Sequence, residues 1–115
     1  MASTNIILED VKKQVGLIPE YDAFDDQLLM DINAAFATLH QLGVGPADGF
    51  TIEDEYTEWT DFVNDDAQLQ AVKSYMYLKV KLRFDPPLST AVIESTNRMI
   101  AELEWRLNVA AESEE

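Results

Sequence analysis

Two consecutive prolines directly follow a long helical pattern, and they constrain the fold more than any other feature. They lie in the stretch KVKLRFDPPLS, residues 79–89. Pro87 disfavours helical backbone at Pro86, and Pro86 disfavours it at Asp85, so the chain must leave the helix extended. Ser89 can then cap a new helix. We therefore predict that Asp85, Pro86 and Pro87 form a rigid corner that sets the angle of a helical hairpin.

Apolar residues recur with helical spacing in four segments of the chain, which predicts four α-helices. The predicted helices cover about residues 6–15, 23–42, 66–84 and 90–108. Asp65 followed by Gln68 resembles a capping box at the start of the third of these helices. In the last helix, the predicted apolar face consists of Val92, Ile93, Met99, Ile100, Leu103 and Leu107.

Three of the four glycines lie in the acidic loop GVGPADGFTIEDEYTE, residues 43–58. Phe50 and Ile52 alternate with polar residues there, and Trp59 and Phe62 predict a further helical turn. We expect an all-α, compact bundle of four to five helices with a long acidic loop that can carry a short β-hairpin. At 115 residues the chain fits one domain, predicted at residues 1–108 and followed by an acidic tail, residues 109–115.

The helix predicted at residues 66–84 carries two apolar stripes instead of one. The first stripe consists of Ala71, Tyr75, Leu78 and Leu82, and the second of Val72, Met76, Val80 and Phe84. Their centres lie about 140° apart on a helical wheel. Such a helix is either central in its own fold or shared with another subunit. We predict a subunit contact for the second stripe, with its burial against the chain's own first helix or loop as the alternative.

Charge is segregated along the chain, whose net charge is −14 with 22 acidic and 8 basic residues. No Lys or Arg occurs between residues 14 and 72, whereas half of the bases lie between residues 73 and 83. An acidic surface repels DNA. Segregated charge also suits contacts in which the acidic face of one subunit meets the basic stretch of the next, so these bases are candidates for the predicted subunit contact. The alternative is that they complement the dipole of their own helix end and the acids of their own loop. They are Lys73, Lys79, Lys81 and Arg83.

Trp105 is expected on the side of the last helix away from its apolar face. Arg98 lies two helical turns earlier on the same side. Because Trp and Arg are enriched at the energetic centres of protein interfaces, these two residues are candidate partner contacts. The alternative is that Trp105 packs against the acidic loop of its own chain.

The sequence contains no pattern that predicts catalysis, a cofactor or a metal site. It has no cysteine, and His40 is its only histidine. The stretch GVGPADG lacks the Lys-Ser/Thr ending of a phosphate-binding loop, and the acidic clusters do not match a calcium-binding loop. A solvated acidic face is the better interpretation of those clusters. We expect no secretory signal, because no basic region precedes the short apolar run near residue 6, and no apolar run approaches the length of about 18 residues that spans a membrane.

Four stretches occur in the order and spacing of a known family. They are LEDVKKQVGL, LLMDINAAFATLHQLGVGP, YMYLKVKLRFDPP and ELEWRLN. From about residue 8 to residue 108 the chain resembles the small helical head–tail connector (adaptor) proteins of long-tailed phages and prophages. The resemblance implies a non-enzymatic protein, made in the host bacterial cytoplasm and assembled into the neck of the virion.

The same resemblance implies a set of partners. Its members form a ring beneath the portal protein, and a dodecamer would match the symmetry of the portal. The ring extends the DNA channel, through which DNA passes without sequence-specific binding. It also provides the docking surface for the next connector, a stopper or a tail-completion protein.

Two other classes of function remain open from the residues alone. A monomeric acidic interaction or inhibitor protein would bind a basic partner, and an enzyme domain would place its site in the glycine-rich loop. The size of the protein in dilute solution and in an assembled particle separates the first of these classes from a connector.

Overall fold

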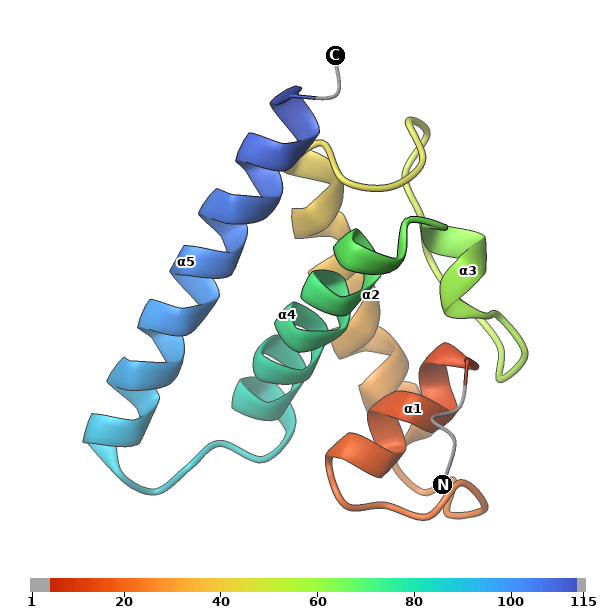
Figure 1. The fold of residues 1–115 in the computed structure, drawn as a ribbon. Helices are drawn as coiled ribbons and strands as arrows, with labels where there is room; N and C mark the ends of the chain where they lie inside the picture. Colours follow the sequence, from red (N-terminus) through yellow and green to blue (C-terminus); the bar gives the residue numbers. More distant parts are fainter. Residues whose placement is uncertain (1–4, 114–115) are drawn as a thin grey trace.

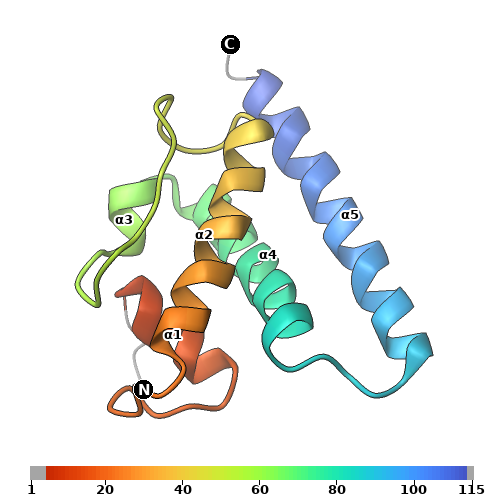
Figure 2. The same cartoon turned by 180° about the vertical axis from the view of Figure 1, so that it is seen from behind.

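Helix α4 is the centre of the molecule, and it packs against α1, α2 and α5 (Figures 1 and 2). The computed structural model describes residues 5–113. These residues form α1 (Ile7–Gln14), α2 (Asp25–Gln41), α3 (Trp59–Phe62), α4 (Asp66–Phe84) and α5 (Thr90–Ser113). The predicted all-α class and the order of the helices are confirmed.

Both apolar stripes of α4 are used inside the chain. In the first stripe, the Tyr75 hydroxyl donates a hydrogen bond of 2.7 Å to Glu104 in α5. In the second stripe, the ring of Phe84 meets the ring of Phe24 edge-on at the start of α2, with centroids 5.2 Å apart. One stripe therefore faces α5 and the other faces α2, which explains why a single helix carries two.

The predicted subunit contact is wrong for three of the four residues in the second stripe. Val72, Met76 and Val80 are each 0% exposed and belong to the main hydrophobic core. A side chain with no accessible surface cannot reach another subunit unless the fold opens. The alternative prediction, burial inside the chain, is the correct one for these residues. Phe84 is only half-buried, so it alone keeps surface for an external contact.

An aromatic cluster joins α2, α3 and the loop before α3. The ring centroid of Phe36 lies 5.0 Å from that of Phe50, 6.3 Å from Trp59 and 4.7 Å from Phe62. The indole N–H of Trp59 donates a 2.9 Å hydrogen bond to the buried carboxylate of Asp10 in α1. The short α3 was predicted from two of these aromatic residues, and it anchors the loop to the rest of the fold.

The loop between α2 and α3 is held by one side chain instead of by strand pairing. The Asn33 side-chain amide donates to the carbonyl of Ile52 at 2.9 Å, and the amide of Ile52 donates to the Asn33 oxygen at 2.8 Å. The short β-hairpin allowed by the sequence is not formed in residues 43–57. In the described part of the chain, β-type pairing is limited to an isolated bridge between Ile6 and Glu58.

Gly45 allows the start of this loop to pass close to α3. Its φ is +91°, in the region that favours glycine. A Cβ atom at this position would lie 2.3 Å from the nearest ring atom of Phe62. Both the backbone conformation and the space therefore require glycine here.

Lys12 fixes the connection between α1 and α2, although it is only 2% exposed. Its ammonium group lies 2.6 Å from the Asp25 carboxylate and donates to the carbonyl of Pro19 at 3.0 Å. These partners compensate for the loss of water around the buried charge. Lys12 is therefore a structural residue.

The start of α4 differs from its prediction. The side chain of Asp65 makes no capping hydrogen bond, so the predicted pairing with Gln68 is not formed. A capping box occurs instead at α3, where the side chains of Glu58 and Asp61 accept hydrogen bonds from each other's backbone N–H groups. The capping residues thus stabilise the shorter helix, which cannot rely on length.

Helix α5 is longer than predicted, and its end covers the end of α2. It continues to Ser113 and so includes residues 109–113 of the predicted tail, while residues 114–115 lie outside the described part. The Asn108 side-chain amide donates to the carbonyl of Leu42 at 3.1 Å, and Ala111 packs against the core. These contacts explain why the helix continues beyond its last strongly apolar residues.

Candidate interaction surfaces

The basic end of α4 pairs with acids of its own chain. The ammonium of Lys81 lies 2.7 Å from the Asp85 carboxylate, and the guanidinium of Arg83 lies 3.8 Å from the Asp31 carboxylate in α2. The hydrogen bond to Asp85 raises the pKa of Lys81. The exposed pair of Lys81 and Asp85 contributes only about 0–1 kcal/mol, so Lys81 can change partner at low cost. The carboxylate that faces Arg83 is only 7% exposed, whereas the Arg83 side chain itself is exposed.

The other two bases of the predicted contact lie over aromatic rings. The Lys73 ammonium is 5.8 Å from the ring centroid of Trp59, and the Lys79 ammonium is 5.8 Å from that of Tyr75. Neither lysine forms an ion pair with a residue in the range 5–113. These cation–π contacts orient the two side chains along α4 but leave both positive charges without a carboxylate.

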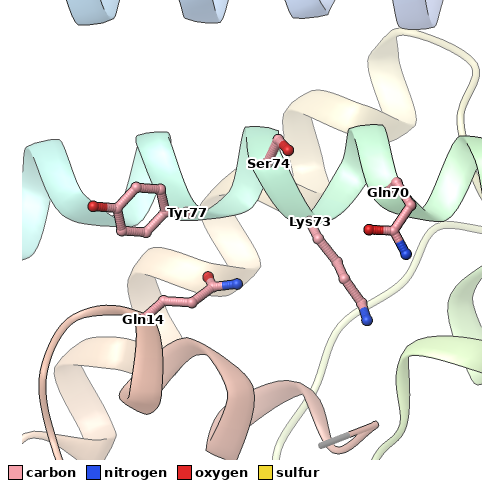
Figure 3. A pocket seen from close by; sticks show the side chains of 5 residues that line it. All are labelled: Gln14, Gln70, Lys73, Ser74 and Tyr77. Carbon is pink, nitrogen blue, oxygen red and sulfur yellow. The ribbon is translucent and has the colours of Figure 1, made fainter. Parts of the chain in front are cut away.

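Lys73 borders a polar depression of about 320 Å³ between α1 and α4 (Figure 3). The side-chain oxygen of Gln14, from α1, is buried there without a hydrogen-bond partner. The remaining lining residues come from α4 and are Gln70, Ser74 and Tyr77. The depression offers hydrogen-bonding groups and one positive charge.

Asp31 in α2 is a buried carboxylate that faces the basic end of α4. It is 6% exposed, and its Oδ2 atom has no hydrogen-bond partner among the described residues. Burial raises the pKa of Asp31, and the nearby Arg83 guanidinium opposes only part of this effect. Ionisation of the Asp31 carboxyl group therefore opposes folding at neutral pH.

The corner between α4 and α5 has the predicted form. Helix α4 ends at Phe84, the next residue, Asp85, has φ −147° and ψ 70°, and the two prolines continue the non-helical backbone. The amide of Val92 donates to the Ser89 hydroxyl at 3.4 Å, so the predicted cap of α5 is formed. Leu88 in this corner is fully exposed. The helical hairpin is confirmed, because α5 packs back along α4.

Trp105 lies on the outer side of α5, where it is 66% exposed. The alternative that it packs against the acidic loop is therefore wrong. Arg98 is also exposed on this helix and has no ion pair with another described residue. Both candidate partner contacts are thus accessible, as an interface role requires.

The predicted apolar face of α5 is only partly buried. Ile100 and Leu107 are buried as expected, whereas Val92 is 48% and Met99 is 46% exposed. The buried residues Thr96, Ile100 and Leu107 centre on a direction about 60–80° round the helix from Val92 and Met99, so these two lie at the rim of the buried face. The first turns of α5 also diverge from α4 at the corner (Figures 1 and 2). Helix α5 therefore presents apolar side chains to solvent along an edge that its own chain does not cover.

The loop before α3 lies at the edge of the molecule opposite α5 (Figures 1 and 2), and its sequence is rich in acidic residues. Glu53, Asp54 and Glu55 are exposed, which confirms the predicted solvated acidic face at this loop. Asp54 Oδ1 accepts hydrogen bonds from the amides of Tyr56 and Thr57 at 2.9 and 3.1 Å. The Tyr56 amide and the Thr57 hydroxyl lower the pKa of Asp54. The loop tip therefore has a defined shape and remains negatively charged.

The histidine and the acidic side chains of the described residues are the groups to compare with known kinds of site. His40 is exposed on α2, beside a depression of about 300 Å³ between that helix and the loop. Among residues 5–113, no group of three His, Cys, Asp or Glu side chains is arranged to hold a metal ion. Within the same residues, no helix combines the length and apolarity needed to cross a bilayer.

The fold is a small helical domain that exposes apolar and aromatic side chains on α5 and acidic side chains on the loop before α3. The family model described as "Phage connector protein" matches residues 7–114. The chain therefore belongs to the phage connector protein family, and the resemblance noted in the sequence is confirmed. No curated protein and no solved structure matches the chain significantly.

Proposed function

We propose that the protein is a head–tail connector that forms a ring beneath the portal protein at the neck of the virion. The family match over residues 7–114 is the observation that carries this proposal. The ring would hold the number of subunits that fits the portal, with a dodecamer as the expected state. Its role is structural and not catalytic.

The surfaces of the chain support this role in two ways. Exposed apolar and aromatic side chains on α5 suit permanent contacts with other virion proteins. The net charge of −14 suits a channel wall along which DNA slides, because Lys and Arg contacts are what create tight non-specific binding to DNA. The ring would extend the portal channel and offer its far side to the next connector, a stopper or a tail-completion protein.

The bases of α4 keep a place in this proposal as contacts to protein neighbours. Lys73 and Lys79 have no ion pair among residues 5–113, the exposed pair of Lys81 with Asp85 is weak, and the Arg83 side chain is exposed at 3.8 Å from Asp31. We assign these four bases, with the half-buried Phe84, to contacts with acidic surfaces of neighbouring proteins in the neck.

A second candidate function follows from the charge alone. A monomeric acidic protein of this size would bind a basic partner and inhibit it by imitating the charge of DNA. This function predicts a monomer in every state and no incorporation into virions. The presence or absence of the protein in virions therefore separates the two candidates.

The test uses the phage or prophage that encodes the chain, with an early stop codon introduced into its gene. The expected result is heads without attached tails, and normal virions when the intact gene is supplied in trans. Electron microscopy of complemented virions carrying an epitope tag on the chain should place the label at the neck. Complete, infectious virions that lack the protein would overturn the proposal.

A further inference from the structure

The outer side of α5 is a large surface that the chain does not use for its own core. At 100° per residue, the arc from Val92 through Met99 to Trp105 covers about 140° of the helix. These three residues are 48%, 46% and 66% exposed. A helix that faces only water normally carries polar residues over such an arc. On this arc the exposed apolar side chains alternate with charged ones, among them the pair of Arg106 and Glu102, and an apolar patch with polar surroundings is typical of a contact surface.

Arg98 lies inside the same arc, two helical turns before Trp105. It has no ion pair with residues 5–113, whereas Arg106 pairs with Glu102 at 2.9 Å. A guanidinium beside an exposed indole is the residue combination found at the energetic centres of interfaces. The partner that fits it offers carboxylates and an exposed aromatic ring.

The acidic loop of the same chain has these properties. Glu53 and Glu55 are exposed on either side of Asp54, and Tyr56 is 73% exposed. No Lys or Arg between residues 14 and 72 neutralises this segment from within. The hydrogen bonds accepted by Asp54 fix the loop tip, so a partner would lose little conformational entropy on binding it.

The α5 arc and the acidic loop lie at opposite edges of the molecule in both views (Figures 1 and 2). One copy therefore cannot bring its own two surfaces together. Two different, complementary surfaces at opposite edges produce a head-to-tail contact, and repetition of such a contact closes a ring when the rotation between copies allows it.

We propose that the outer face of α5 in one copy docks on the acidic loop of the next copy. Arg98 pairs with Glu53 or Glu55, and Trp105 packs against Tyr56. This inference rests on the proposed ring and assigns the two surfaces that join its subunits. The charge pair orients the subunits, and the aromatic pair supplies the buried apolar area.

The first test is disulfide cross-linking in virions, which is direct because the natural chain has no cysteine. Glu102, exposed in the middle of the α5 arc, and Glu55 are replaced together by Cys in one chain. Oxidation of virions should give a ladder of dimers and larger multimers on a non-reducing gel. The pair Glu102→Cys with Ser74→Cys is the matched control, because Ser74 is exposed on the central helix α4.

The single variants distinguish the mode of contact. A head-to-tail contact gives no cross-link with Glu102→Cys alone or Glu55→Cys alone. A dimer formed by Glu102→Cys alone would mean that two α5 helices meet across a two-fold axis. That result, or a ladder that is equally strong for the Ser74 control, would overturn the proposal.

The second test is charge reversal. Arg98→Glu and Glu55→Lys should each lower incorporation into virions at least tenfold, and the double variant should restore most of it. Lys13→Glu is the matched control, since Lys13 is exposed on α1 and forms no ion pair in the described chain. Each purified variant should retain the helical circular dichroism of the parent, because all three sites are exposed.

The outcomes separate this inference from the proposed function. If the wild-type protein is absent from virions, both the connector role and the docking contact are refuted. If the wild type is present and Arg98→Glu is incorporated equally well, the docking contact is refuted and the connector role is still supported. Restoration by the double variant supports both.

Discussion

Replacing Met76 by Glu should unfold the monomer, and the structure allows the loss to be calculated. Met76 is 0% exposed in the core between α4 and its neighbours. Removing its apolar side chain from the core costs about 1.5–3 kcal/mol. An unpaired buried carboxylate adds about 3–5 kcal/mol. The combined loss of about 4–8 kcal/mol is comparable to the entire stability of a typical domain, about 5–15 kcal/mol.

Two further variants separate the burial of Met76 from other effects. Met76→Leu keeps the volume and polarity of the core, so it should cost less than about 1.5 kcal/mol. Trp105→Glu adds the same charge to a residue that is 66% exposed, and it should change stability by no more than about 0.5 kcal/mol. Trp105→Glu should nevertheless be poorly incorporated into virions, because it places an acid against the acidic loop of the neighbouring copy.

The assay is chemical denaturation of the purified proteins, followed by far-ultraviolet circular dichroism and supported by thermal melts. Met76→Glu should be largely unfolded, or should melt more than about 10 °C below the parent. If Met76→Glu denatures at the same denaturant concentration as the parent, residue 76 is not in the core and the assignment of the second stripe to the interior is wrong.

Three other predictions address the loop, the buried acid and the corner. Gly45→Ala should lower the free energy of unfolding by about 2–5 kcal/mol, the sum of about 1–2 kcal/mol of backbone strain and about 1–3 kcal/mol of steric overlap with Phe62. Gly49→Ala, with φ +90° and open space around it, should show the strain alone. Equal losses of stability for the two variants in urea denaturation would contradict the steric overlap. Asp31→Asn should stabilise the protein at pH 7, because the raised pKa of Asp31 means that its ionisation opposes folding, and the gain should vanish as the pH falls below the ordinary carboxyl range; a pH-independent gain would refute this cause. Replacing Pro86 and Pro87 together by Ala should let α4 continue past the corner and reduce virion assembly while the thermal melt stays cooperative; normal yields of infectious virions would show that the corner has no such role.

The positions of the long helices could be predicted from the sequence because apolar spacing is a local property. The observed bounds of α4, Asp66–Phe84, are those predicted, and α1 and α2 differ by one or two residues at each end. The corner was also predictable, because proline restricts the backbone of the residue before it whatever the rest of the fold does.

The surroundings of each helix face could not be predicted in the same way. The two stripes of α4 were visible in the sequence, but whether Met76 faced its own chain or a neighbour depended on how α2 and α5 pack around it. Val92 and Met99 have the spacing of a buried face, yet they are exposed because they lie at its rim, about 60–80° round the helix from the centre of the buried residues Thr96, Ile100 and Leu107. The exposed Arg98 and Trp105 could be predicted because the helical angle places them off the apolar face, and because Trp and Arg are enriched at the centres of interfaces.

The two hydrogen bonds between Asn33 and Ile52 couple the deuterium exchange of a loop amide to the opening of a helix. An amide in an irregular segment usually exchanges through local fluctuations of a few residues. The amide of Ile52 is bonded to a side chain that is rooted in α2, and Ile52 is only 1% exposed. Its proton can leave only when the Asn33 side chain rotates away or α2 itself opens. On the slow timescale of hydrogen exchange, the middle of the loop should therefore be protected together with α2.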